Sequence, residues 1–174
     1  MISNGRPETP DGERIIGLFL NTLPVRLALE SGSWEELVTE TFRAEREMLP
    51  FRRYPLAQIQ RENGGRALFE TCFNFTHFHV YESVASLSEI EVLSAGGEGN
   101  TNFTLMVDFN VRTQTPEIDV VVGCDETQIG PAQAQLIAGY YQRLLEAMAQ
   151  ASESEHHEQY SVLSEEERQR LLVE

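Results

Sequence analysis

The strongest constraint on the fold is an alternation of apolar and polar residues from Phe103 to Val111, which only Met106 interrupts. This period of two is typical of a β-strand that buries one face. A second apolar run, Ile118 to Cys124, follows after a short connection and predicts an antiparallel partner strand. Beyond Gly130, apolar residues recur at helical spacing and predict a long helix. Strands followed by a covering helix predict an α/β fold, a two-layer sandwich of a mostly antiparallel or mixed sheet covered by helices.

An earlier segment, Phe69 to Val80, is rich in aromatic and β-branched residues and predicts another long strand. Its phenylalanines and histidines at odd positions would share one face, whereas Asn74 and Thr76 would lie on the other. Downstream, Glu89 to Leu93 predicts a weaker strand. The glycine-rich run 95–100 predicts a flexible turn, or a crossing to a neighbouring lobe.

Two helices are expected before this strand. Ser33 fits an N-cap, and with Glu36 three residues later it forms a capping box, in which each side chain satisfies a free backbone amide. The helix that follows should end before Pro50. A shorter helix from Pro55 to Glu62 would place a proline in its first turn and stop at the glycine pair that follows.

The segment from Ile15 to Arg26 is apolar except at a few positions and predicts a buried strand with a polar notch. Gly17 would let another backbone approach closely, and Asn21 with Thr22 would need hydrogen-bond partners in dry surroundings. Pro24 has no amide hydrogen to donate. An edge strand, in which the Asn–Thr pair caps a local irregularity, is therefore the alternative.

Composition limits the class of protein. The 174 residues are enough for one soluble globular unit, and residues 1–13 predict a loop without the features of a signal peptide. No apolar run approaches the roughly 20 residues of a membrane span. The net charge of −15 argues against partners that need positive patches, so neither nucleic acid nor a membrane surface is expected. Cys72 and Cys124 lack a paired motif and predict buried, reduced thiols, which suits a cytoplasmic protein.

Three short motifs follow one another along the chain. The first comprises Ile16-Gly17, Phe19, Asn21-Thr22 and Arg26, the second is Tyr54-Pro55-Leu56, and the third runs from Arg61 to Phe69. In this order they resemble motifs of the C-terminal half of the condensation domains of nonribosomal peptide synthetases. The third departs from the family pattern, with Glu62 for Asp, Gly64 for Ser and Ala67 for Pro. The segment Leu163 to Arg168 resembles the linker into a following adenylation domain, and within it Ser164 with Glu167 predicts the start of a small capped helix.

The resemblance implies half of a chloramphenicol acetyltransferase-like fold. Residues 1–151 would be the C-terminal lobe of a condensation domain lying mostly upstream, and residues 152–174 a linker toward an adenylation domain. Such a domain forms an amide between acyl and aminoacyl groups carried on two peptidyl carrier proteins. Their phosphopantetheine arms enter a tunnel between the lobes, so no cofactor is expected on this chain itself. The implied partners are the N-terminal lobe, the carrier proteins and the adjacent adenylation domain.

Four polar residues on otherwise apolar segments are candidates for facing this tunnel or bracing its wall: Asn21, Arg26, Asn74 and His77. Ordinary inter-strand pairing is the alternative for each of them.

The family's catalytic His-His-x-x-x-Asp-Gly motif belongs to the N-terminal lobe. The printed sequence has one His-His pair, His156-His157, and Ser161 and Val162 stand where Asp and Gly should be. This pair lies in an acidic, linker-like stretch, which predicts an exposed tail. No catalytic residue is therefore expected here, and the chain alone is expected to lack condensation activity.

Other chemistry finds little support in the sequence. His77 and His79 would point to one face of a strand, as a metal site needs, but no third ligand is near. Hydrogen-bonded, partly buried histidines without a metal are the expectation. The glycines from 96 to 99 are not followed by Lys-Ser/Thr, so a phosphate loop is not indicated.

Two rival functions remain open. One is a non-catalytic module that docks carrier proteins or serves as a scaffold, and the other is an epimerization or cyclization variant of the same superfamily. The strand from Phe69 to Val80 also carries large apolar residues on both faces. An uncovered face is expected from this pattern, and with it self-association of the isolated lobe.

Overall fold

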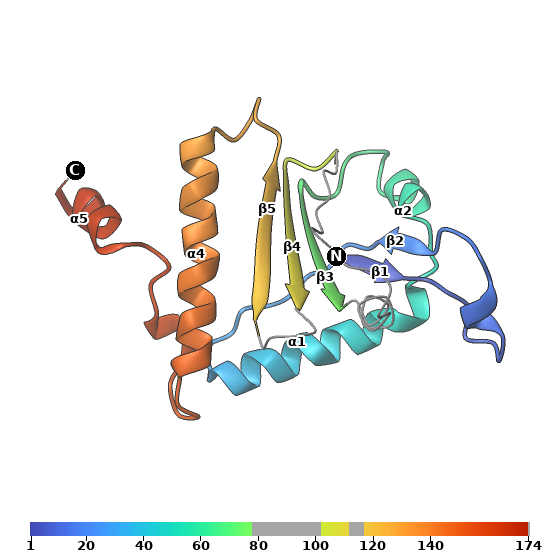
Figure 1. The fold of residues 1–174 in the computed structure, drawn as a ribbon, viewed down its shortest axis with the longest axis horizontal. Coiled ribbons are helices and arrows are strands. Elements are labelled where there is room, and N and C mark those ends of the chain that lie inside the picture. The colour runs from blue at the N-terminus through green and yellow to red at the C-terminus, as the bar shows by residue number, and fades with distance from the viewer. Residues whose placement is uncertain (78–101, 112–116, 174) are drawn as a thin grey trace, which may run out of the picture.

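The computed structural model describes residues 1–77, 102–111 and 117–173. Its main sheet has three seven-residue strands in the order β3 (Thr71–His77), β4 (Leu105–Val111) and β5 (Ile118–Cys124) (Figure 1). β3 runs parallel to β4, and β4 runs antiparallel to β5, so the sheet is mixed. The predicted α/β class and the predicted antiparallel pair are confirmed.

One face of this sheet carries the apolar core. Val107 and Phe109 of β4 are buried there. The long helix α4 (Pro131–Gln150) lies beside β5, and the ring of Tyr141 meets that of Phe109 edge-on, with 5.8 Å between the ring centroids. The predicted covering helix is thus confirmed. Burial of apolar rings between the helix and the sheet stabilises this pair of layers.

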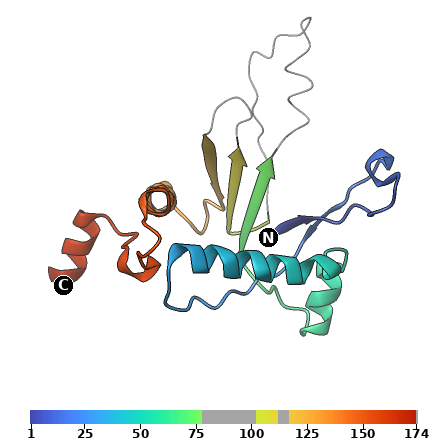
Figure 2. The same cartoon turned by 90° about the horizontal axis from the view of Figure 1, so that it is seen from below.

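The helix α1 (Trp34–Met48) runs across the direction of the strands, as Figures 1 and 2 show. It begins with the predicted capping box. The amide of Glu36 donates to Ser33 Oγ at 3.2 Å, and the amide of Ser33 donates to Glu36 Oε2 at 2.8 Å. The helix ends before Pro50, as predicted, and passes into the short 3-10 helix η2 (Leu49–Phe51).

The second helix, α2 (Leu56–Glu62), follows Pro55, which is its N-cap. Gly64 and Gly65 come directly after its end with φ angles of +82° and +73°. This left-handed region is open to glycine without a steric penalty. The predicted glycine stop is confirmed.

The N-terminal region corrects two predictions. Residues 1–13 are not all loop, because β1 (Ile2–Asn4) pairs antiparallel with β2 (Leu20–Thr22). The buried strand expected from Ile15 to Arg26 is also wrong. Only three of its residues form strand, and the side chain of Ile16 is 99% exposed.

Of the alternative expectation, the edge strand is confirmed for β2, but the side chain of Asn21 caps no local irregularity, because it donates to carbonyls more than 30 positions away. The amide of Leu23 donates to Met1 O at 2.9 Å just beyond the strand. Pro24 follows and has no amide hydrogen to continue the ladder.

The segment between β1 and β2 projects from the body of the molecule (Figure 1), and Arg6 makes several contacts within it. Arg6 Nη1 donates to the carbonyls of Gly12 at 3.2 Å and Ile15 at 3.1 Å. Its guanidinium lies 5.0 Å above the ring centroid of Phe19. A Cβ added to Gly17 would lie 3.1 Å from that same ring, so this glycine accommodates a ring and not a backbone.

The described chain ends with η3 (His157–Gln159) and α5 (Glu165–Val173). The predicted cap of the last helix is confirmed. The amide of Glu167 donates to Ser164 Oγ at 3.2 Å, and the amide of Ser164 donates to Glu167 Oε2 at 2.7 Å.

Cys72 in β3 is buried and Cys124 in β5 is half-buried, and both thiols are free. Within the described ranges, no helix combines the length and the apolar character that crossing a membrane requires. The weaker strand expected at 89–93 and the glycine-rich run 95–100 lie outside the described residues.

Candidate functional site

Hydrogen bonds connect the three sequence motifs in space. Asn21 of the first motif donates from Nδ2 to the carbonyl of Tyr54 in the second, at 2.8 Å, and to the carbonyl of Arg52 at 3.0 Å. The hydroxyl of Tyr54 in turn donates to Glu62 Oε1 of the third motif at 2.5 Å. Both amide hydrogens of Asn21 are therefore used to hold the turn that carries the second motif.

The Tyr54–Glu62 bond also changes the acidity of both groups. Because the phenol donates to the carboxylate, the pKa of Glu62 is lowered and the pKa of Tyr54 is raised. Gln58 strengthens the effect on Glu62 by donating to the same oxygen at 3.1 Å. At neutral pH the tyrosine stays protonated and the carboxylate stays ionised, which keeps this contact intact.

Two arginines tie the same turn to the N-terminal strand region. Arg53 Nε donates to Gly5 O at 3.1 Å, and its Nη2 donates to Arg6 O at 3.3 Å. Arg52 Nη2 also donates to Arg6 O, at 3.3 Å, and pairs with Glu8. Charged donors on carbonyls make stronger hydrogen bonds than neutral ones, so the turn and the strand form one braced unit.

A polar patch occupies the face of the main sheet opposite the apolar core. Asn74 Nδ2 donates to Asp108 Oδ1 at 2.8 Å and to Thr76 Oγ1 at 3.2 Å. Asn110 and Asp119 are register partners on β4 and β5, in the same row as Thr76. Asn74, Thr76 and Asp108 are half-buried, so the pair forms partly out of water.

Asp108 is the residue that sequence reasoning missed as a site candidate. The alternation of its strand places it on the polar face of that strand. The parallel register of β3 with β4, which puts the two residues side by side, could not be read from either segment alone.

The other two candidates stand apart from these groups. Arg26 is exposed in the extended segment between β2 and α1, and no described residue forms a hydrogen bond or ion pair with its guanidinium. His77 ends β3 opposite Val111, and the position of its side chain is not described. His79 lies outside the described residues. The structure therefore does not bring the four candidates together in one site.

The expectation that the histidine pair near the C-terminus lies in an exposed tail is wrong, because one of its members is packed. The side chain of His157 is only 14% exposed. Its ring meets Trp34 edge-on, with 5.9 Å between the centroids, and its Nε2 lies 2.9 Å from Glu30 O. The acidic composition around the pair predicted exposure, but the aromatic surface of Trp34 offers it a partner.

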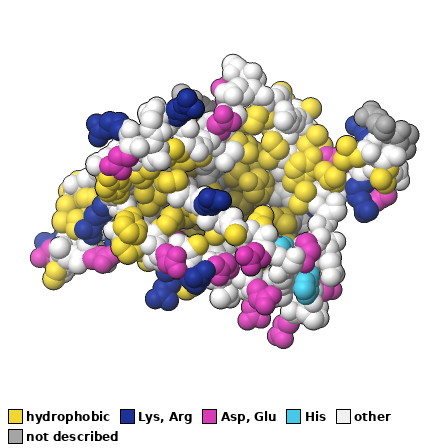
Figure 3. Space-filling model, turned by 180° about the vertical axis from the view of Figure 1, so that it is seen from behind, with side chains coloured by type: hydrophobic (Ala, Val, Ile, Leu, Met, Phe, Trp, Pro, Cys, Tyr) yellow, Lys and Arg dark blue, Asp and Glu magenta, His cyan; other side chains and the backbone are white. Residues whose placement is uncertain are grey.

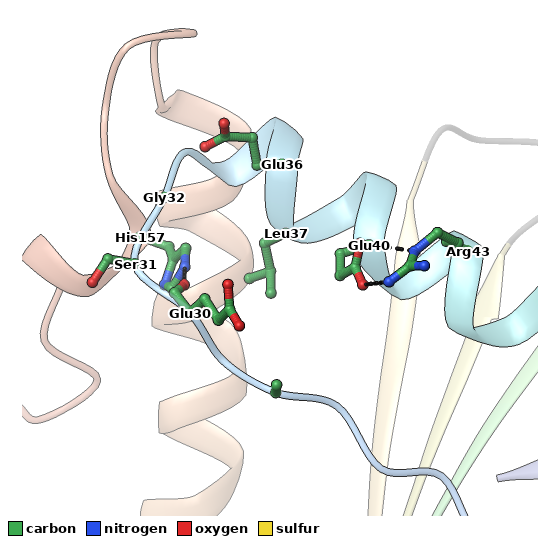
Figure 4. Close-up of a pocket in the computed structure, with 9 residues that line it drawn as sticks. Glu30, Ser31, Gly32, Glu36, Leu37, Glu40, Arg43 and His157 are labelled. Carbon is green, nitrogen blue, oxygen red and sulfur yellow. Dashed lines mark hydrogen bonds and ion pairs between the residues drawn. The ribbon is translucent and has the colours of Figure 1, made fainter.

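A cavity of about 420 Å³ lies between this histidine and the start of α1 (Figure 4). Glu30, Glu36 and Glu40 line it together with His157 and Arg43. Two of the carboxylates are already used, since Glu36 completes the helix cap and Glu40 pairs with Arg43. In the part of the chain that the structure describes, no group of three His, Cys, Asp or Glu side chains could hold a metal ion.

Comparison with known protein families agrees with the motif order. The family described as "Condensation domain" matches residues 1–172. The chain is 34% identical over 155 residues to AMB antimetabolite synthetase AmbE of Pseudomonas aeruginosa, a match that covers 84% of this chain and 7% of that protein. It is 32% identical over 179 residues to a linear gramicidin synthase protein of Brevibacillus parabrevis, a match that covers 98% of this chain and 3% of that protein.

Among solved structures, the starter condensation domain of rhizomide synthetase RzmA has a similar fold, with a TM-score of 0.62 at 18% identity. The match covers 85% of this chain and 36% of that one. The chain thus spans a small part of its synthetase relatives and about a third of the solved chain. With a family match across nearly its whole length, the chain belongs to the condensation-domain family.

Proposed function

We propose that this chain is the C-terminal lobe of a condensation domain that forms amide bonds in nonribosomal peptide synthesis. The observation that carries the proposal is the family match over residues 1–172. The hydrogen bonds that join Asn21, Tyr54 and Glu62 support it, because they tie the three ordered motifs into one braced part of the lobe. Residues 1–151 form the lobe, and residues 152–174 lead toward an adenylation domain.

In the proposed reaction, the amine of an aminoacyl group attacks the thioester carbonyl of an acyl group on a second carrier protein. The new C–N bond forms as the C–S bond breaks, and the amine proton leaves with the thiol. Both groups arrive on phosphopantetheine arms of carrier proteins in the cytoplasm. This chain supplies a wall of the tunnel, and the catalytic histidine comes from the N-terminal lobe.

Within this wall the candidate residues take different roles. Asn21 holds the turn that carries Arg52 and Tyr54, because both of its amide hydrogens are bound to carbonyls of that turn. Asn74 with Asp108 offers a half-buried polar pair that can orient an amide or amine of a substrate. Arg26 has no described partner and is free to contact a negatively charged group. His77 is the fourth candidate on the tunnel side.

The test is amide formation between loaded carrier proteins, followed by mass spectrometry of the product. We expect this chain alone to give no product above background, since it lacks the His-His-x-x-x-Asp-Gly motif. The chain joined to the N-terminal lobe of its own synthetase should give the amide. Activity of the isolated chain would contradict the proposal.

The same assay separates the rival functions. A docking or scaffold module would yield no product even with the N-terminal lobe present. A cyclization variant would release water and give a lighter product. An epimerization variant would change the stereochemistry of a carrier-bound residue without joining two of them.

A further inference from the structure

We propose that Asp108 and Asn74 bind the attacking amine of the aminoacyl substrate, and that Asp108 also fixes the direction in which the amide of Asn74 points. This inference rests on the proposed function and deepens it, because it names the group of the substrate that the polar patch takes. The two residues lie on neighbouring strands, β4 and β3, which run side by side (Figure 1).

The partners of Asn74 determine which way its amide faces. Its Nδ2 donates to Asp108 Oδ1 at 2.8 Å and to Thr76 Oγ1 at 3.2 Å. A carboxylate only accepts hydrogen bonds, so the nitrogen of the amide, and not its oxygen, must face Asp108. Both amide hydrogens are used in this way. The oxygen of the amide therefore points away from these two partners.

Two oxygen atoms of the pair, Asn74 Oδ1 and Asp108 Oδ2, accept no hydrogen bond from any described residue. Among the described residues, Trp34 Nε1 is the only buried side-chain nitrogen or oxygen that lacks a partner. The two oxygens are therefore not sealed in the interior. They are accessible hydrogen-bond acceptors on half-buried side chains.

The sheet face beside this pair is accessible as well. Asn74, Asp108 and Val121 are register partners on the three strands of the main sheet, so their side chains share one face. Val121 is 54% exposed. A ligand can therefore reach Asp108 from the β5 side of the same row.

The charge of this site favours a cation. No described arginine or histidine forms an ion pair with Asp108. Burial raises the pKa of the Cys72 thiol on the same face of β3, and the negative charge of Asp108 adds to this rise. A carboxylate with an open oxygen attracts an ammonium group, which only donates hydrogen bonds, and repels phosphate. A primary amine is therefore the group of the substrate that fits best.

The same arrangement suits the attack on the thioester. After it loses a proton, a primary amine keeps two N–H bonds and has one lone pair. Hydrogen bonds from these N–H groups to Asn74 Oδ1 and Asp108 Oδ2 leave the lone pair available for the thioester carbonyl. Holding a nucleophile in one orientation lowers the entropic part of the barrier.

The experiment uses the chain joined to the N-terminal lobe of its own synthetase and two stable pantetheine ligands. One ligand carries a glycyl group and the other a glycolyl group, each through an amide in place of the thioester. They differ only in an amine against a hydroxyl, so the pantetheine arm cannot cause a difference between them. We expect isothermal titration calorimetry to show about tenfold tighter binding of the amine ligand, the factor for one charge-assisted hydrogen bond. Equal affinities would overturn the proposal.

Asp108→Asn tests the carboxylate. The new side chain keeps an oxygen for Asn74 but replaces the second oxygen by a donor, so the preference for the amine ligand should disappear. The matched control is Met106→Leu, a change of similar size on the same face of β4, which should keep the preference. A preference that survives in Asp108→Asn would refute the role of Asp108.

Thr76 tests the direction of the Asn74 amide. Thr76→Val keeps the shape of the side chain but removes the acceptor of one amide hydrogen, so the amide can turn and the preference should fall. Thr76→Ser keeps the hydroxyl and should keep the preference. Equal losses in both variants would contradict the positioning of Asn74. This pair of variants and the two ligands still decide the question if circular dichroism shows that Asp108→Asn does not fold.

Amide formation by the same proteins separates this inference from the proposed function. A preference for the amine ligand without any amide product would refute the function and leave the binding site in place. We expect kcat/KM for the aminoacyl carrier protein to fall about tenfold in Asp108→Asn. Amide product with equal kcat/KM in wild type and Asp108→Asn would refute the site and leave the function in place.

Discussion

At the scale of single residues, the polar side chains are explained by partners far away in sequence. The need of Asn21 for partners could be predicted, because an amide in an apolar segment does not stay unpaired. The identity of its partners could not be predicted, because they are carbonyls 31 and 33 positions away in a turn without periodic pattern. The same holds for His157, whose partner Glu30 O is 127 positions away. Composition around a residue does not reveal such partners.

Replacing Asn21 tests its bracing role. Asn21→Ala leaves the carbonyls of Arg52 and Tyr54 without their donor, so the free energy of unfolding should fall by about 1–3 kcal/mol. The matched control is Asn63→Ala, which removes one exposed bond to Ile59 O four residues away. Urea unfolding followed by circular dichroism measures both. Equal losses in the two variants would contradict the special role of Asn21.

At the scale of helices and strands, signals within a few residues predicted well. Both capping boxes connect positions three residues apart, and the alternation within β4 shows which of its side chains share a face. The sequence alone was therefore sufficient to predict these features. The prediction failed for Ile15 to Arg26, because burial depends on what covers a segment. There the loop organised by Arg6 carries Ile16 and Leu18 out into solvent. The parallel register of β3 with β4 could likewise not be predicted, because neither segment alone determines it.

The cap of α5 should make stability depend on pH. Hydrogen bonds from Tyr140 and then from Ser164 lower the pKa of Glu167 to about 2 from its ordinary value of 4.5. A carboxyl whose pKa is lower in the folded state contributes stability above about pH 4.5, and this contribution is lost as the pH falls toward 2. The stability difference between wild type and Glu167→Gln should therefore be present at pH 7 and vanish near pH 2.

Urea unfolding at a series of pH values measures this difference. Glu166→Gln is the matched control, because its carboxylate pairs only with Arg170 and both side chains are more than 70% exposed. Such a surface pair contributes little to stability. A difference for Glu167→Gln that stays constant between pH 7 and pH 2 would refute the linkage.

At the scale of the whole molecule, much apolar surface has no cover within the described residues. Figure 3 shows a broad field of hydrophobic side chains across one face. Exposed apolar side chains include Leu18 on the projecting loop, Val38 and Phe42 on α1, and Phe73 and Phe75 on β3. The solved chain of similar fold is nearly three times as long as the part matched here. Sequence periodicity predicted the apolar positions but could not say which would stay open.

An uncovered surface of this kind should make the isolated chain associate with itself. Contiguous exposed apolar patches usually mark contact sites, because burying them removes apolar area from water. The side chains of Val38 and Phe42 are 51% and 59% exposed, one turn apart on the same side of α1. We expect light scattering to give an apparent mass above that of the 19.7 kDa chain, rising with concentration. Val38→Ser combined with Phe42→Ser should lower it, whereas Thr39→Ser on the same helix should not. Co-expression with the N-terminal lobe should replace the self-associated form by a one-to-one complex, because both partners compete for one surface. A chain that stays monomeric at high concentration, and that the N-terminal lobe leaves unchanged, would show that this apolar surface is no interface.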